Sequence, residues 1–569
     1  MKIRFSALLA LLLLTLTVSA QKTSDSLNRV RTYDVLHYVI RLKFDPDAKK
    51  VFGDSSIELT PLGTPLDKVV LDSEETRFDF VGFDGTDEKA AYEVKNSKIT
   101  VYLDRKYEPG EKIALRFRYT ALPTKGIYFV EAQKDEGKEV RSAQIWTQGE
   151  SEETHHWLPS YDFPDDKATT EQYLTIPSDE TAIANGAFLG KSANSDGTQT
   201  WHYRMDIPHS VYLTSFVIGK YVKVSDKYGD IPLGYYLYPG EESTAPLAFG
   251  RTKDMMRIFE QVTGLPYPYN KYDQIVVADF QWGGMENITA TTLADTEIAF
   301  AKFKFGQAIV DDLVSHELAH SWFGDLVTCR NWAELWLNEG FATFMEAVYR
   351  EKSAGRASYN QKVRQDANEY LGYEASKGSS VHALYNTEAD ASDDDSMFDT
   401  VTYQKGGAVL HTLREEIGDE AFWKGVNIYL NRHKLGNVES KDLKAAMEET
   451  SGKDLSWFFD QWVYKAGHPK LKVTHYYDAK KKLLKIRFQQ TQQGVRKGGD
   501  KESNIPDVFV LPLEIGIKTG ASTKTEKIRL EKRSQDVEIA VRAKPSKVTI
   551  DPSNKIPLKQ VSVTEALFK

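Results

Sequence analysis

Two histidines four residues apart stand near the middle of the chain, in the segment HELAH from His316 to His320. A step of four residues turns an α-helix by about 400°, so the two imidazoles would point the same way, about 6 Å apart. That spacing lets them share one metal ion, and Glu317 lies close enough around the helix to reach a water on it. A motif this short also arises by chance, so it needs supporting context.

A third potential ligand lies on the next helical pattern of the sequence. Glu339 follows His320 by nineteen positions, in the segment WAELWLNEGFATF. Its helix must fold back antiparallel on the first to bring the carboxylate to the histidines. Catalytic zinc sites usually have three nitrogen or carboxylate ligands plus water. The alternative is an ordinary helix pair that carries polar residues, but the third ligand at a workable distance favours a site for one zinc ion.

Three further segments carry recognisable patterns in a consistent order around this motif. Residues 147–168 read TQGESEETHHWLPSYDFPDDKA, residues 283–287 read GGMEN and residues 402–410 read TYQKGGAVL. Together with HELAH and Glu339, which eighteen residues separate from it, they resemble the motifs of the aminopeptidase N family of zinc metallopeptidases. GGMEN is similar to the GxMEN exopeptidase signature of that family. The flanking patterns extend the resemblance over nearly the whole chain after residue 20.

The resemblance implies a role for each residue of the metal motif. His316, His320 and Glu339 would be the ligands of the zinc ion, and Glu317 would be the general base that takes a proton from a water on that ion. Tyr403 would donate its hydroxyl to the oxyanion that forms in the reaction. A buried core tyrosine is the alternative for Tyr403.

Glu346 follows Glu339 by seven residues and therefore lies on the same face of the predicted helix. From that position its carboxylate could orient one of the ligand histidines. A solvated glutamate is equally compatible with the sequence.

The same resemblance implies a binding site for the amino end of a peptide, formed by Glu286, Glu150, Gly283, Gly284 and Met285. A free α-amino group has a pKa of about 7.7–8.0 and is largely cationic at pH 7, so two carboxylates beside the zinc would bind it. The two glycines would let an extended substrate lie against the backbone as an added strand. Met285 would line the pocket for the first side chain. The expected partners are peptides with a free N-terminus.

Some features depart from the family pattern or leave other functions open. The segment after Glu150 reads HHWLPSYDFPDDKA, where relatives often have AR-x-x-x-PC-x-D-x-P. The alternatives are a zinc endopeptidase, a bifunctional hydrolase that also opens a lipid epoxide, and a non-catalytic peptide-binding protein. Glu286 argues against an endopeptidase, because a carboxylate at the amino end blocks the passage of a continuous chain. Glu317 and Tyr403 argue against a non-catalytic protein.

The hydrophobic pattern predicts which elements position these residues. Alternating apolar and polar residues predict strands from residue 33 to about 222, spacings of three and four predict helices after residue 223, and strands return after residue 468. We therefore expect a multidomain α+β fold. Its predicted parts are an N-terminal all-β domain over residues 21–222, a thermolysin-like α/β zinc catalytic domain over residues 223–467, and a β-sandwich over residues 468–569. Many members of the family that the chain resembles add a large C-terminal helical domain over the active site; we expect it to be missing here, which would leave a more open cleft.

Composition and the first residues indicate partners and location. The net charge of −9 argues against a nucleic-acid partner. Residues 1–20 combine Lys2 and Arg4, an apolar run and the ending Val-Ser-Ala, which is typical of a signal peptide. A membrane anchor is the alternative, but a span needs about 20 apolar residues. We expect an exported protein, periplasmic or secreted, with no membrane contact after cleavage and a monomer favoured.

The chain has one cysteine, Cys329, so it has no internal disulfide. We expect this residue to be a small buried hydrophobe, with a free reactive thiol as the alternative.

Overall fold

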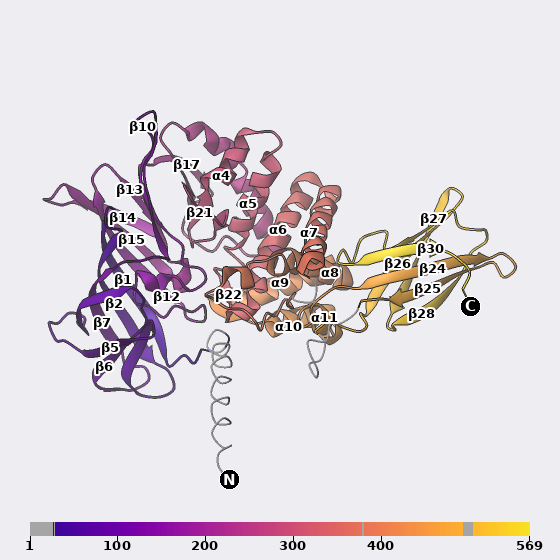
Figure 1. The fold of residues 1–569 in the computed structure, drawn as a ribbon, viewed down its shortest axis with the longest axis horizontal. Coiled ribbons are helices and arrows are strands. Elements are labelled where there is room, and N and C mark those ends of the chain that lie inside the picture. Colours follow the sequence, from indigo (N-terminus) through magenta and orange to yellow (C-terminus); the bar gives the residue numbers. More distant parts are fainter. Residues whose placement is uncertain (1–26, 28, 378–380, 493–503, 569) are drawn as a thin grey trace, which may run out of the picture.

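The computed structural model describes residues 27, 29–377, 381–492 and 504–568, and the predicted signal peptide over residues 1–20 lies outside them. Strands dominate both ends of the described chain and helices dominate its middle, as Figure 1 shows. This order agrees with the predicted α+β class. Within the described ranges, no helix has both the length and the apolar character needed to cross a bilayer.

The N-terminal region is built from antiparallel sheets with one parallel pair, β1 with β12. Alternation of apolar and polar residues explains its strands. In β7, for example, the residues at 113, 115, 117, 119 and 121 are buried and those between them are more exposed. The strands, in spatial order within each sheet, are β14 (Ala187–Ala193), β15 (Thr198–His209), β12 (Ala168–Pro177), β1 (Tyr33–Asp45), β2 (Lys50–Pro61), β7 (Ile113–Ala121) and β4 (Thr76–Phe83); β3 (Leu66–Asp72), β6 (Lys98–Tyr107) and β5 (Ala91–Lys95); β13 (Thr181–Ala184), β16 (Phe216–Gly219), β11 (Gln144–Thr147) and β8 (Ile127–Val130); and β10 (Lys138–Arg141) with β9 (Gln133–Asp135).

A five-stranded mixed sheet follows in the region that was expected to be α/β, although the hydrophobic pattern after residue 223 indicated helices. Its strands, in spatial order, are β17 (Val222–Tyr228), β18 (Ile231–Leu237), β19 (Tyr272–Val277), β21 (Ala290–Ala294) and β20 (Gly284–Met285). The pattern missed β19 and β21 because every residue in them is buried, so their sequences do not alternate. The boundary predicted after residue 222 lies one residue inside β17.

Helices then form the body of the middle region. The helices are α2 (Ala245–Ala248), α3 (Thr252–Thr263), α4 (Asp295–Ile298), α5 (Gln307–Ala319), α6 (Trp336–Ala354), α7 (Arg356–Lys377), α8 (Gly406–Ile417), α9 (Asp419–His433), α10 (Ser440–Ser451) and α11 (Ser456–Trp462). The region also contains a two-stranded sheet of β22 (Val327–Cys329) and β23 (Gly436–Val438). Short 3-10 turns are η1 (Thr154–His156), η2 (Val211–Leu213), η3 (Glu242–Thr244), η4 (Ala299–Lys302), η5 (Trp332–Glu334) and η7 (Asp394–Ser396), and η8 (Val401–Lys405) is a π-helical turn.

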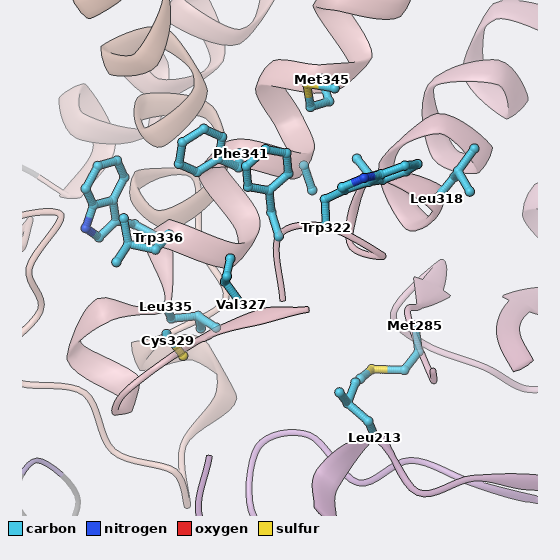
Figure 2. Close-up of a cluster of buried hydrophobic side chains, with 14 of the residues drawn as sticks. Leu213, Met285, Leu318, Trp322, Val327, Cys329, Leu335, Trp336, Phe341 and Met345 are labelled. Carbon is cyan, nitrogen blue, oxygen red and sulfur yellow. The ribbon is translucent and has the colours of Figure 1, made fainter. Parts of the chain in front are cut away.

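Apolar packing fixes the end of α5 against α6. Figure 2 shows Trp322, Phe341 and Met345 within one buried cluster of this region. The rings of Phe323 and Phe341 are parallel, with centroids 4.2 Å apart. Cys329 belongs to the same cluster and is buried, as expected for a small apolar residue. This packing holds the loop after the HELAH motif against the helix that carries Glu339.

Two glycines let α8 approach α6 closely. A Cβ built on Gly406 would lie 2.8 Å from Cα of Gly340, too close for any side chain there. The η8 turn, which carries Tyr403, leads directly into α8. The contact between the two glycines therefore brings Tyr403 to the helix that carries Glu339.

The C-terminal region contains a four-stranded and a three-stranded sheet. Strand β25 alternates strictly between buried and half-buried residues, so one face of its sheet is packed. This arrangement agrees with the strands predicted after residue 468. The strands, in spatial order, are β28 (Ser534–Ala540), β25 (Leu483–Gln490), β24 (Lys470–Asp478) and β30 (Gln560–Glu565), and β27 (Ser522–Leu530), β26 (Leu511–Thr519) and β29 (Lys547–Ile550).

Candidate metal centre and active site

The two histidines of HELAH and Glu339 converge at one buried point between α5 and α6. Nε2 of His316 lies 3.2 Å from Oε2 of Glu339, and Nε2 of His320 lies 3.4 Å from the same oxygen. Ligand atoms bonded to one tetrahedral zinc at about 2.0–2.1 Å lie about 3.3 Å apart. The donor set and its spacing therefore fit a zinc ion. Helix α5 ends at Ala319, but His320 keeps helical backbone angles, so the four-residue spacing still places the two rings together.

Each ligand histidine is held by a hydrogen bond through its other nitrogen. Nδ1 of His316 lies 2.8 Å from Oε1 of Glu346, and Nδ1 of His320 lies 2.8 Å from the carbonyl oxygen of Phe323. Both acceptors lack a proton, so Nδ1 is the donor in each ring and Nε2 faces the converging point. This is the usual arrangement of metal-binding histidines. Glu346 is thus buried against His316 rather than solvated.

A buried salt-bridge network supports Glu346 from behind. Lys362, on α7, lies 2.8 Å from Oε2 of Glu346 and 2.6 Å from Asp366. Neither α7 nor this lysine was predicted from the sequence. The signal was present, because Tyr359, Val363 and Tyr370 recur at helical spacing and Lys362 stands four residues before Asp366.

Three more carboxylates crowd the same point. Glu150, Glu286 and Glu339 have ligand oxygens within 4.8 Å of one another, and Glu286, Glu317 and His320 form a second group of this kind. One oxygen each of Glu150, Glu286 and Glu317 is buried without a hydrogen-bond partner. Unpaired buried oxygens are costly unless a ligand satisfies them. These three carboxylates can therefore accept hydrogen bonds from a cationic ligand in addition to interacting with the two histidines.

The charges of the cluster follow from burial and crowding. Burial raises the pKa of Glu317 to about 8 and also raises the pKa of Glu286. Burial opposes ionisation of Glu339 too, but His320 and His316 lower its pKa overall. The hydrogen bonds with Glu339 and Glu346 outweigh burial and raise the pKa of His316 to about 9. A divalent cation would offset the excess of carboxylates and favour their ionised forms.

Glu150 comes from the N-terminal region and reaches the site because β11 packs on the strands beside GGMEN. Nε1 of Trp146 donates to the carbonyl oxygen of Ala278 at 3.0 Å. Nε2 of Gln148 lies 3.1 Å from the sulfur of Met285. These contacts carry the chain from β11 directly to Glu150.

The GGMEN segment forms the edge strand β20, in register with β21, with Gly284 opposite Leu293 and Met285 opposite Thr292. A Cβ on Gly284 would lie 2.1 Å from Oε1 of Glu317, so the glycine makes room for that carboxylate. This close approach could not be read from the sequence.

The predicted binding residues of this segment differ in their positions. Gly284, Met285 and Glu286 line the same pocket as the metal cluster, whereas Gly283 is not among its described lining residues. Gly283 instead has a φ of 78°, and its carbonyl oxygen accepts a hydrogen bond from Ala294. It lies in a bend before β20, and its contact with substrate stays a prediction.

Tyr403 lies over the metal cluster. Its ring stacks on that of His316, with centroids 5.9 Å apart and an interplanar angle of 16°. Burial and the nearby Glu339 raise the pKa of its hydroxyl well above the usual range, so the group remains a hydrogen-bond donor. The turn that carries Tyr403 begins where Asp399 accepts hydrogen bonds from the backbone of Val401 and Thr402. π-Helical turns of this kind are frequent at functional sites.

The pocket over the cluster has a volume of about 630 Å³. The sequence motifs predicted the metal ligands and the carboxylates of its lining but not its other lining residues. The unassigned lining residues are Gln148, Trp282, Leu313, Tyr373, Lys377, Asp395, Phe398, Asp399, Thr400 and Gln404. Most belong to segments without a short motif, so only the fold brings them to the site.

Two family models match this chain. The peptidase M1 N-terminal domain matches residues 34–213, and the peptidase family M1 domain matches residues 247–462. Together the matches cover well over half of the chain and include every residue of the metal cluster.

Three of the curated relatives that match this chain are named as aminopeptidases or probable aminopeptidases. Aminopeptidase N of Streptomyces lividans is 34% identical over 334 residues, which cover 57% of this chain and 38% of the relative. Aminopeptidase 2 of Candida albicans is 29% identical over 522 residues, 89% of this chain and 54% of the relative. Probable aminopeptidase 1 of Saccharolobus solfataricus is 27% identical over 505 residues, with 87% and 60% covered. The chain thus spans about half the length of these relatives.

Proposed function

The chain belongs to peptidase family M1, as its motifs predicted, and on that premise we propose that it is a zinc-dependent aminopeptidase that removes the N-terminal residue from peptides. Membership rests on the two matching family models. The observation that carries the proposal is the position of Glu150 and Glu286, whose ligand oxygens lie within 4.8 Å of that of Glu339. A cationic amino end bound by these carboxylates would lie directly beside the metal ligands.

We assign one zinc ion to His316, His320 and Glu339. Zinc held there would supply Lewis-acid chemistry, lowering the pKa of water and polarising a carbonyl group. Glu317 then takes the proton of the attacking water and passes it to the leaving amine. Tyr403 donates its hydroxyl to the oxygen that gains negative charge. Glu346 keeps His316 oriented throughout.

Substrate binding follows from charge and from the sheet edge. Glu286 and Glu150 accept hydrogen bonds from the ammonium group of the substrate. Holding the amino end there places the peptide bond after the first residue at the metal. Strand β20 is at the edge of its sheet, so an extended peptide can align with it as a further strand. Met285 lines the pocket for the first side chain.

A zinc endopeptidase is the second candidate, because the metal cluster alone would serve either reaction. The buried carboxylate of Glu286 disfavours it, since an internal peptide segment has no cation to place there. A non-catalytic peptide-binding protein is disfavoured by the presence of Glu317 and Tyr403 at the cluster. We also propose export to the periplasm or the medium, which rests on the signal-peptide pattern of residues 1–20.

The test is an assay of the purified chain on a panel of aminoacyl fluorogenic amides. A chelator should abolish hydrolysis and added zinc should restore it, because the cluster supplies three ligands to one ion. His320→Ala removes one ligand and should not be rescued by zinc at the same concentration. Hydrolysis that persists after the metal has been removed would contradict the proposal.

A further inference from the structure

A second group of histidines and glutamates lies in the N-terminal region, away from the active-site pocket. Glu74, His155 and His156 each offer one ligand atom, and these atoms lie within 4.8 Å of one another. Nε2 of His155 is 3.6 Å from Oε2 of Glu74. The two imidazole centroids are 4.7 Å apart, close to the 4.8 Å between the rings of His316 and His320. Two imidazoles and a carboxylate are a donor set that suits zinc and similar transition metals.

Each of these histidines is also held through Nδ1 by a carboxylate. Nδ1 of His155 lies 2.8 Å from Oδ2 of Asp162, and Nδ1 of His156 lies 3.0 Å from Oε2 of Glu75. An ionised carboxylate only accepts, so Nδ1 carries the proton in both rings and Nε2 is left as the ligating nitrogen. At the first centre, Nδ1 of His316 is likewise held by a carboxylate and Nδ1 of His320 by a backbone carbonyl oxygen, and both arrangements are expected of a metal site.

The backbone holds this group in place before any ligand binds. The amide of Glu74 donates to the carbonyl oxygen of His155 at 3.1 Å. Glu75 adopts a φ of 55°, an unfavourable angle for a residue other than glycine. Its carboxylate accepts hydrogen bonds from Thr124 as well as from His156, so the side chain of this strained residue is held by two different residues. Strained backbone of this kind is concentrated at functional sites.

The group lines an open pocket of about 590 Å³. Carboxylates outnumber cationic side chains on its walls. The acidic lining residues are Asp72, Glu74, Glu152, Glu153 and Asp390, and the basic ones are Arg29, Lys98 and Lys125. An acidic, solvent-accessible pocket favours entry of a metal cation over that of an anion.

We propose that Glu74, His155 and His156 form a second site for a divalent transition metal, with zinc as its first candidate. It has three protein ligands and faces solvent, so water completes the coordination. The site does not depend on the proposed peptidase activity, because none of its residues lines the active-site pocket.

The experiment measures bound zinc by elemental analysis after saturation with zinc and dialysis. The wild-type chain should bind about two zinc ions, and His320→Ala about one, which remains at the second site. Glu74→Gln and His155→Ala should each lose about one of the two ions. Glu93→Gln removes an exposed carboxylate from β5 in the same region and should keep both.

Glu74→Gln is the decisive variant, because its side chain is 44% exposed and the change should not unfold the chain. Circular dichroism in chelator checks that each variant is folded. As a second readout, zinc should raise the melting temperature of His320→Ala and not that of the His320→Ala, Glu74→Gln double variant. A wild-type chain that binds only one zinc, or a second ion that survives both Glu74→Gln and His155→Ala, would overturn the proposal.

Discussion

The centre between α5 and α6 and the group at Glu74, His155 and His156 use the same ligand types in different surroundings. The first pair of histidines is spaced by one helical turn and buried, with rings at an interplanar angle of 72°. The second pair is consecutive on a 3-10 turn, with rings at 29° and side chains 13% and 10% exposed, close to the 12% of His316. Ligand type alone therefore does not tell a reaction centre from a binding site.

What separates the two is the set of groups around the ligands. Glu150, Glu286 and Glu317 each leave a buried oxygen unpaired at the first centre. Around the second, Oδ2 of Asp162 and Oε2 of Glu75 hold the histidines, and only Oδ1 of Asp162 among the oxygens of these two carboxylates is buried without a partner. We infer that the first centre keeps polar groups free for a substrate, whereas the second uses its own to fix the ligands.

Glu317→Gln should have the largest effect on the first centre and none on the second. The amide cannot accept a proton, so turnover should fall by roughly 10²–10⁴ while the bound metal is kept. Steady-state kinetics and elemental analysis on the same sample measure both quantities. Retention of more than about a tenth of wild-type turnover would remove Glu317 from the role of general base.

Tyr403→Phe should come next in size. It keeps the ring stacked on His316 and removes one hydroxyl, so the loss should fall on kcat, by about 10²–10³. A change confined to KM would instead assign Tyr403 to packing against the substrate.

Glu346→Gln should have a smaller effect, on metal affinity. Loss of the charge that holds His316 should weaken zinc binding at the first centre by about 10–100-fold. Competition with a chelator of known affinity measures the change, and the second group should be unaffected. Glu369→Gln, an exposed glutamate on α7, is the matched control. Equal zinc affinity in both variants would show that Glu346 does not support the metal site.

The sequence predicted the parts of the first centre that short motifs encode. His316 and His320 could be placed together because helical geometry fixes the distance between neighbouring turns, whereas Glu339, on another helix, was assigned through the family resemblance. The contact between Lys362 and Glu346 and the remaining lining of the pocket could not be predicted, since they depend on how α7 and the loop before η8 pack. The clearance between Gly284 and Glu317 is likewise a property of two segments far apart in the chain.

Alternation of apolar and polar residues decided which strands could be predicted from the sequence. Strands such as β7 alternate and were predicted, whereas β19 and β21 are buried on both faces and give no alternation. From the sequence, His155 and His156 could be noted only as part of a segment that departs from the family pattern. Their contact with Glu74 comes from pairing between distant segments, including the bridge between Asp72 and Ser160.

The central claim is that carboxylates beside the metal ligands bind a free amino end, and Glu286 tests it most directly. Wild type and Glu286→Ala are each assayed on the free and the N-acetylated form of one peptide amide. Loss of a hydrogen bond to a charged group costs about 1.5–3 kcal/mol, so Glu286→Ala should lower kcat/KM on the free amine by roughly 10–150-fold. Acetylation should nearly abolish cleavage by wild type, and the mutation should then cost little more. If wild type cleaves both forms equally well, or cuts the acetylated peptide internally, the claim is wrong and the zinc endopeptidase replaces it.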